Sequence, residues 1–361
     1  MNCVPDKSLK QLSEIAEIVK QAAAAAGFDL AGIAPVSDFP ELGHFPEWIA
    51  AGHAGEMKYM ESRDEAGHLK RASLKSTFPW ARSVIVCAVN YNTAQPYSTE
   101  AHDPERGWIA RYAWSREDYH EAVMRRLRLV ETNVREASAK DVFTRCYVDT
   151  GPVVERVYAK YAGVGWIGKN TCILNQKLGS WLFLGVILTS LDLQPDIPAP
   201  DRCGTCTRCI EACPTDALIA PYQLDSNKCI SYLTIEKRSV IPEEMREGLG
   251  QHVFGCDICQ DVCPWNRKAP ATNATEFQPR EGLVNPGLLW LAEMKAEEFL
   301  EMFRGSPIRR TKHSGLRRNA VIAIGNSGDQ DFVPALQKLA EDEDPVVAEM
   351  ARWAQKKLSS D

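Results

Sequence analysis

Residues 203–214 read CGTCTRCIEACP, and residues 255–264 read GCDICQDVCP. The first run spells C-x2-C-x2-C-x3-C-P and the second spells C-x2-C-x3-C-P, with Cys229 between them. Each iron of a cubane [4Fe–4S] cluster takes one thiolate, and in two-cluster ferredoxins the cysteine before the proline ligates the other cluster. The pattern therefore predicts two [4Fe–4S] clusters, one held by Cys203, Cys206, Cys209 and Cys263 and the other by Cys213, Cys229, Cys256 and Cys259.

Zinc and disulfide bonds are the alternative uses of these cysteines. Zinc sites combine paired C-x2-C knuckles, often with histidine, and do not explain a proline-terminated pattern that occurs nearly twice. Disulfides belong to oxidising compartments, whereas the N-terminal MNCVPDKSLKQ lacks the apolar run of a secretory signal. The sequence predicts a cytoplasmic protein without a membrane span, and no role for the remaining cysteines, Cys3, Cys87, Cys146 and Cys172.

The composition is that of a globular protein that is larger than a ferredoxin. The chain has 361 residues, of which 45% are hydrophobic, and a net charge of −6. This length predicts two to three domains. The acidic balance does not predict a nucleic-acid partner, which would need a local basic patch.

Helical and strand patterns alternate along the first part of the chain. Helices are predicted for residues 8–26 and 119–137 and from Pro152, and apolar strands for residues 28–36, 83–91, 143–149 and 180–190. We therefore predict an α+β fold. The proline-rich residues 192–202 form a linker, and the helical pattern from Ser314 resembles a HEAT-like unit. The predicted domains are residues 1–195, 196–282 and 283–361.

Residues 147–170, YVDTGPVVERVYAKYAGVGWIGKN, combine a strand end, a helix and a glycine-rich loop. Asp149 stands where the strand ends, facing that loop, and is a candidate general acid. Its alternative role is to cap the following helix. The loop brings backbone amides close to a ligand, but GVGWIGKN is not the dinucleotide fingerprint G-x-G-x-x-G.

The strings VDTGPVVER, AGVGWIGKN, CGTCTRCIEACPTDAL, KCISYLTIEKR and GCDICQDVCPWN resemble the epoxyqueuosine reductase family. The resemblance runs in order from about residue 10 to residue 355. It implies reduction of epoxyqueuosine to queuosine at the wobble position of tRNA, with two [4Fe–4S] clusters and cobalamin as cofactors. It also implies a nitroreductase-like cobalamin domain, a ferredoxin-like domain, and a C-terminal helical part that holds the anticodon stem-loop.

The same resemblance implies roles for individual residues. Asp149 would donate the proton. The cobalamin would contact Arg71, Ala110, Asp149, Asn170, Ile173, Leu184 and Ser231. The tRNA phosphates would meet Lys237, Arg309, Arg310, Lys312, Arg317 and Arg318.

Two other functions remain open at this point. One is a cobalamin and iron–sulfur reductase that acts on a small molecule, in the manner of a reductive dehalogenase. The other is an electron-transfer subunit that feeds a partner protein. The family resemblance favours an enzyme that acts as a monomer and takes electrons from an external low-potential donor.

Overall fold

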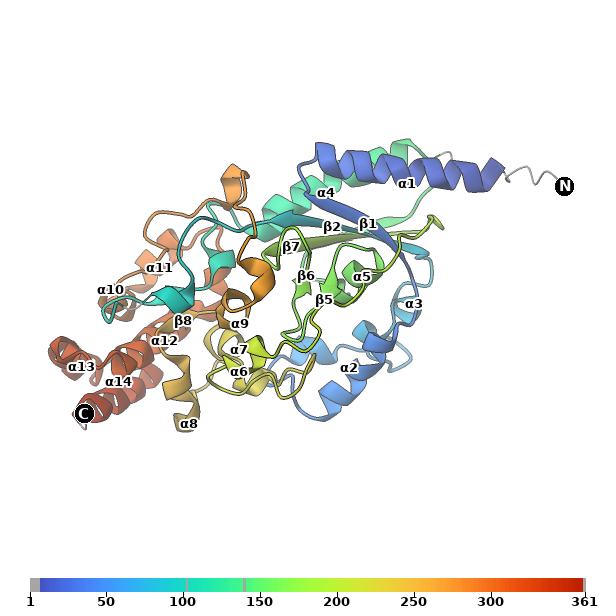
Figure 1. The fold of residues 1–361 in the computed structure, drawn as a ribbon. Helices are drawn as coiled ribbons and strands as arrows, with labels where there is room; N and C mark the ends of the chain where they lie inside the picture. Colours follow the sequence, from blue (N-terminus) through green and yellow to red (C-terminus); the bar gives the residue numbers. More distant parts are fainter. Residues whose placement is uncertain (1–6, 102, 139–140, 360–361) are drawn as a thin grey trace.

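The computed structural model describes residues 7–101, 103–138 and 141–359, so Cys3 lies outside the described residues. One antiparallel sheet forms its centre (Figure 1). The strands follow the order β1-β2-β7-β4, with bounds β1 (Leu30–Pro35), β2 (Ser83–Asn90), β7 (Leu182–Thr189) and β4 (Thr144–Tyr147). Each neighbouring pair is antiparallel. The arrangement confirms the predicted α+β class.

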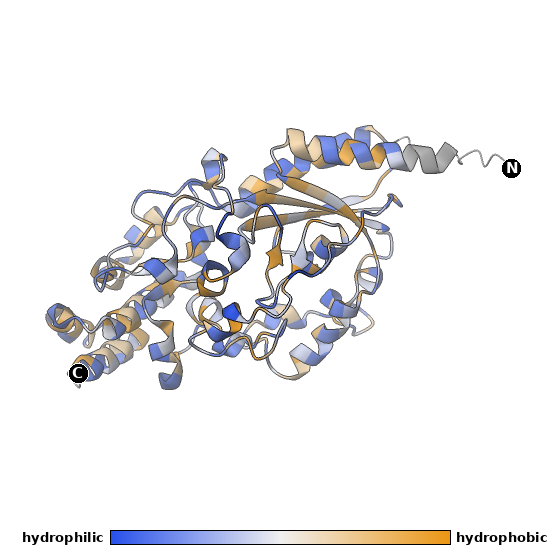
Figure 2. Cartoon of the chain, viewed as in Figure 1, coloured by the Kyte–Doolittle hydropathy of each residue, from blue (hydrophilic) through white to orange (hydrophobic). Residues whose placement is uncertain are grey.

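Helices cover both faces of this sheet, and all eight residues of β2 are buried as a result. Ile85 and Cys87 pack in the core under one helical layer, together with Cys146 of β4. Val84 and Val86 pack in the core under the other. The first layer consists of α1 (Lys7–Ala25) and α4 (Tyr119–Glu136), and the second of α2 (Pro40–Ala50), α3 (Leu74–Thr77) and α5 (Glu155–Tyr161). The apolar colour that runs along the strands in Figure 2 reflects this double coverage.

Most predicted elements of this part are present, but α5 begins later than predicted. The sequence places Pro152 at the first helical position, whereas the helix begins at Glu155. The chain first makes a turn in which Asp149 has a φ of 56°. Gly151 then packs so tightly on the Tyr147 ring that a Cβ would lie 2.4 Å from a ring atom. Residues 152–154, predicted to form the first turn of the helix, therefore precede it in the structure.

The cysteine-rich region consists mainly of short elements around loops. They are α6 (Arg208–Glu211), α7 (Ile230–Ile235), α8 (Glu243–Arg246), α9 (Ile258–Asp261) and β8 (His252–Phe254). Two small sheets lie outside the central one, and the first of them joins the cysteine-rich region to the preceding chain. One pairs β3 (Trp108–Ile109) with β8, and the other pairs β5 (Trp166–Ile167) with β6 (Ile173–Leu174). Residues 192–202, predicted as a linker, contain neither helix nor strand.

The C-terminal part is helical and shares a core with the cysteine-rich region. Its helices are α10 (Leu288–Glu293), α11 (Ala296–Met302), α12 (Lys312–Ser327), α13 (Val333–Leu339) and α14 (Pro345–Leu358). The shared core includes Trp108, Leu233 and Leu316, one from each predicted domain. The predicted domain limits stay a prediction. In the described part of the chain, no helix combines the length and apolar character that crossing a bilayer requires.

Candidate functional site

Four cysteines of the predicted first cluster lie together. Burial raises the pKa of Cys263 to about 11, and the thiols of Cys203 and Cys209 raise it further. Burial also raises the pKa of Cys209, again with a contribution from Cys203 and a smaller one from Cys206. Thiols influence one another's pKa in this way only at short range. These thiols therefore lie near one another, and the assignment of the four cysteines to one cluster stays a prediction.

The other four cysteines form a second group. Burial raises the pKa of Cys256 well above its ordinary value, and Cys229 and Cys213 raise it further. The pKa of Cys259 is also raised, first by a hydrogen bond with Cys172, then by burial and by Cys256 and Cys229. These are the cysteines that the sequence predicts for the second cluster; their thiols lie near one another, and their role as its ligands stays a prediction.

The helix α7 begins directly after Cys229 and directs backbone amides at its sulfur. Burial raises the pKa of the Cys229 thiol, and the N–H groups of Tyr232 and Ser231 that donate to the sulfur oppose this rise. Hydrogen bonds to ligand sulfurs help to set the reduction potential of an iron–sulfur cluster. Ser231, predicted to contact cobalamin, is therefore placed beside the second cysteine group.

Cys172, for which the sequence predicts no role, lies beside the second cysteine group. Its side chain forms a hydrogen bond with Cys259 of the second group. Its N–H donates to Asn170 Oδ1 at 3.3 Å, and Asn170 Nδ2 donates to the Cys259 carbonyl oxygen at 3.1 Å. The glycine-rich loop is thus joined to the second cysteine run. The spacing of the residues in the sequence carries no signal for this contact.

Asp149 is held in place by two aromatic side chains at the start of α4. The Tyr119 hydroxyl donates to Asp149 Oδ2 at 2.9 Å, and His120 Nε2 lies 4.0 Å from the same oxygen. The Asp149 side chain is 70% exposed, so the carboxyl group is open to a ligand. Helix capping does not explain it, because the residue before α5, Val154, makes no side-chain capping bond and Asp149 lies five residues further upstream.

The first residue of α5 adds a second carboxyl group. Burial, and to a lesser degree the charge of Asp149, raises the pKa of Glu155 to about 8. Its Oε1 atom is buried and has no hydrogen-bond partner among the described residues. Glu155 is therefore protonated at neutral pH and has an oxygen free for a ligand. The sequence did not single out this residue, and neither did it single out Tyr119, which is 30 positions from its partner.

Arg71 forms a hydrogen bond with the turn that contains Asp149. Its Nη1 donates to the Tyr59 carbonyl oxygen at 2.9 Å and its Nη2 to the Gly151 carbonyl oxygen at 3.0 Å. It is therefore not a solvated surface arginine. Of the other predicted cobalamin contacts, the buried ones are Ala110, Asn170 and Ile173, and the half-buried ones are Leu184 and Ser231.

The predicted tRNA contacts differ in their exposure. Arg309 and Lys312 are exposed and line a groove of about 600 Å³ that also includes Asp118. Arg310 is exposed as well, and its guanidinium donates to both carboxylate oxygens of Glu236, at 2.7 and 3.0 Å. Asp118 immediately precedes Tyr119, so the groove adjoins the Asp149 site.

Arg317 and Arg318 do not face solvent as predicted. Arg318 is only 1% exposed, and its guanidinium donates to three backbone carbonyls of residues 233–239. Arg317 forms an ion pair with Asp342, and its side chain is 11% exposed. Both guanidinium groups are used in packing α12, because this helix lies inside the C-terminal part. They are not free for phosphate.

Lys237 has a carboxylate partner in the structure. Its Nζ lies 3.0 Å from Glu56 Oε1. Burial alone would raise the pKa of Glu56, but hydrogen bonds from Arg238, Ser239 and Lys237 lower it to about 2. The predicted contact of Lys237 with phosphate would have to break this pairing.

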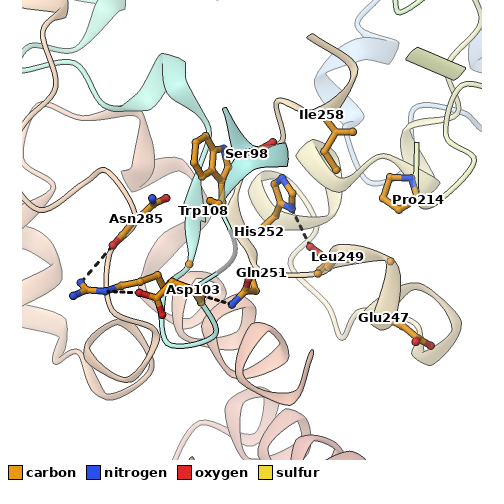
Figure 3. A pocket seen from close by; sticks show the side chains of 15 residues that line it. Ser98, Asp103, Trp108, Pro214, Glu247, Leu249, Gln251, His252, Ile258 and Asn285 are labelled. Carbon is orange, nitrogen blue, oxygen red and sulfur yellow. Dashed lines mark hydrogen bonds and ion pairs between the residues drawn. The ribbon is translucent and has the colours of Figure 1, made fainter. Parts of the chain in front are cut away.

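A separate pocket lies beside the second cysteine run (Figure 3). Its volume is about 340 Å³, and Trp108, Pro214, His252 and Ile258 contribute to its lining. The His252 Nδ1 atom lies 3.1 Å from the Leu249 carbonyl oxygen. Burial lowers the pKa of His252 to about 4, so the ring is neutral. The residues of the Asp149 turn do not line this pocket.

Comparison with known proteins decides the family. Residues 202–266 match the model of the 4Fe-4S double cluster binding domain, and residues 71–150 match the model described as epoxyqueuosine reductase QueG, DUF1730. An epoxyqueuosine reductase of Xanthomonas campestris is 39% identical over 347 residues, which cover 95% of this chain and 96% of that protein. The chain belongs to the epoxyqueuosine reductase family.

Other relatives agree with this assignment. An epoxyqueuosine reductase of Synechocystis is 44% identical over 294 residues, covering 80% of this chain and 98% of that protein. A crystal structure of epoxyqueuosine reductase with an epoxyqueuosine-modified tRNA-Tyr stem loop has a TM-score of 0.85 and 31% identity, and the match covers 96% of this chain and 90% of that one. The predicted family, the fold class and the double-cluster region are thereby confirmed.

Proposed function

We propose that this protein reduces epoxyqueuosine to queuosine at the wobble position of tRNA, with two [4Fe–4S] clusters and cobalamin as cofactors. The observation that carries the proposal is Asp149, an exposed carboxyl group held by Tyr119 beside the protonated Glu155. Family membership supports the substrate. The protein acts as a monomer and receives electrons from an external low-potential donor.

The residues near Asp149 fit a cobalamin. The unpaired Glu155 Oε1 atom and the Arg71 guanidinium offer polar partners, which the amide side chains of a corrin need. Leu184, which is half-buried, offers apolar surface in the same domain. When bound, cobalamin would supply the low-potential cobalt that cleaves a C–O bond, and the two clusters would supply its electrons one at a time.

The reaction consumes two electrons and two protons, and it converts the epoxide into an alkene and water. Asp149 provides a proton at the epoxide oxygen, since its carboxyl group is open to a ligand and fixed in orientation by the Tyr119 hydroxyl. Tyr119 donates to Oδ2, so Oδ1 is the carboxyl oxygen left to contact the epoxide oxygen. General acids of this kind typically contribute 10²–10⁴-fold to a rate.

The test is turnover by Asp149→Asn with intact cofactors. We expect the variant to lose about 10²–10⁴-fold in conversion of an epoxyqueuosine-containing stem-loop, because the amide has no acidic proton. The product nucleoside is measured by mass spectrometry after anaerobic single turnover. Iron content and cobalamin uptake are measured on the same samples.

Asp331→Asn is the matched control, because Asp331 is an exposed aspartate of the C-terminal part. Full turnover by Asp149→Asn would remove the proton-donor role. A wild-type protein that takes up cobalamin but leaves the stem-loop unchanged would favour a small-molecule substrate. A protein with both clusters and no cobalamin uptake would favour the electron-transfer subunit.

A further inference from the structure

Tyr59 is an exposed aromatic residue between two arginines that come from opposite ends of the chain. The residue is 44% exposed. The guanidinium carbon of Arg71 lies 5.7 Å from the centre of its ring, and that of Arg310 lies 5.2 Å from it. Both distances are within the range of cation–π attraction. The ring therefore lies beside two cations, and its 44% exposure leaves part of it open to a further planar group.

The position of Tyr59 is fixed relative to the catalytic turn. The Arg71 guanidinium donates both to the backbone of Tyr59 and to the backbone of Gly151, two residues after Asp149. One planar group thus links the segment that contains Tyr59 to the turn that contains Asp149. On the other side, Glu236 holds the Arg310 guanidinium through two hydrogen bonds. Both arginines beside the ring are thus held by hydrogen bonds of their own.

Two cations, Arg71 and Arg310, lie beside Tyr59 in a protein whose net charge is −6, and the acidic groups that also face it are Glu236 and Asp149. Lys58, Arg309, Arg310 and Lys312 are all exposed. Exposed aromatic rings interleaved with cations are the combination that binds single-stranded nucleic acid, because bases stack on the ring while the cations meet phosphates. Unpaired bases of RNA loops are recognised in the same way. A core role is excluded for Tyr59 by its exposure.

We propose that Tyr59 is the stacking platform for an unpaired anticodon-loop base that neighbours the reacting base. This inference rests on the proposed function. The reacting base has to reach Asp149, and the Arg71 guanidinium lies between that turn and Tyr59. The base on Tyr59 is therefore a neighbour in the loop, and its stacking draws the reacting base out toward Asp149.

The test measures stem-loop affinity of the holoprotein under anaerobic conditions by fluorescence anisotropy. We expect Tyr59→Ala to weaken binding by about 5- to 150-fold, the loss that corresponds to one stacked base. Tyr59→Phe and Tyr59→Trp retain the ring and should retain affinity. Phe143→Ala is the control, since Phe143 is a 65% exposed aromatic residue that precedes β4.

A stem-loop with one abasic position identifies the stacked base. One of the two positions that flank the reacting nucleotide carries the base that stacks on Tyr59. Loss of the base at that position should weaken wild-type binding as much as Tyr59→Ala does. The variant and the abasic site together should then cost no more than either alone, because both remove one contact. Additive losses at both neighbouring positions would overturn the proposal.

Measurement of cobalamin uptake distinguishes a role of Tyr59 in stacking an RNA base from a role in binding the cofactor. Tyr59→Ala with unchanged stem-loop affinity, or with a loss of cobalamin uptake as its only effect, would assign Tyr59 elsewhere and overturn the proposal. Failure of the wild-type protein to convert the stem-loop would instead count against the proposed function. Unchanged iron content in Tyr59→Ala shows that the variant is folded.

Discussion

At the scale of single residues, Glu155 makes a pH-dependent contribution to stability. Its pKa is about 8 in the folded protein, against 4.5 for an ordinary glutamate. Between these values the folded state keeps a proton that the unfolded chain has lost, so the stability of the protein falls as the pH rises. We predict that Glu155→Gln removes this fall. The variant should match the wild type near pH 5 and exceed it near pH 8 in anaerobic thermal unfolding.

Glu41→Gln is the control for this prediction. Burial alone would raise the pKa of Glu41, but the hydrogen bond from Lys160 and its charge lower it overall. Its contribution to stability is therefore complete above the ordinary pKa of a glutamate and is lost only at lower pH. Glu41→Gln should change stability by a constant amount between pH 5 and 8. A constant difference for Glu155→Gln as well would contradict the raised pKa.

The sequence revealed some residues of the site and not others for a physical reason. The cluster cysteines and Asp149 stand out because metal ligation and a strand end impose a local pattern. Tyr119 and Cys172 act through contacts with residues distant in the sequence, Asp149 and Cys259 respectively. Contacts of this kind depend on how the sheet and loops pack, and a single sequence has no marker for them.

At the scale of elements, β1 packs against the end of α5 at Gly32. A Cβ at this position would lie 1.9 Å from the Ala162 carbonyl oxygen, so strand and helix backbones meet directly. We predict that Gly32→Ala lowers the free energy of unfolding by about 1–3 kcal/mol, the usual cost of overpacking. Urea titration followed by circular dichroism measures it.

Gly43→Ala is the matched control for this change. Gly43 lies inside α2, and a Cβ there meets no atom within 4 Å. Alanine is favoured over glycine in helix interiors by about 0.5–1 kcal/mol, so this variant should be slightly more stable. Equal effects of the two substitutions would show that the backbone contact between β1 and α5 does not prevent position 32 from accepting a larger side chain.

The helix α12 shows where prediction from periodicity fails. Residues 318–325 are all buried, because α10, α14 and β8 surround this helix. A helix covered on every side has no polar stripe, so the sequence cannot tell which of its charged residues reach solvent. The prediction that Arg317 and Arg318 bind phosphate failed for this reason.

At the scale of the whole molecule, an acidic protein has a small exposed surface that contains cations. The net charge is −6, yet Arg309 and Lys312 are exposed along a groove next to the Asp149 site. The acidic net charge predicts only that any basic surface must be confined to a small part of the protein. The predicted contact of these two residues with tRNA stays a prediction; Arg309 lies in a 3-10 helix and Lys312 begins α12, and both side chains are exposed.

Salt dependence of stem-loop binding distinguishes the exposed cations from the paired ones. Each phosphate contact releases counterions, so the logarithm of affinity falls with the logarithm of salt concentration. We predict that Arg309→Gln combined with Lys312→Gln reduces the steepness of this dependence by about 2, one for each lost contact. Lys237→Gln should leave the slope unchanged, because Glu56 already neutralises Lys237. Tyr59→Ala should lower affinity at every salt concentration by the same factor, because stacking releases no counterions. If Lys237→Gln changed the slope and the double variant did not, we would conclude that the RNA binds a different face of the protein.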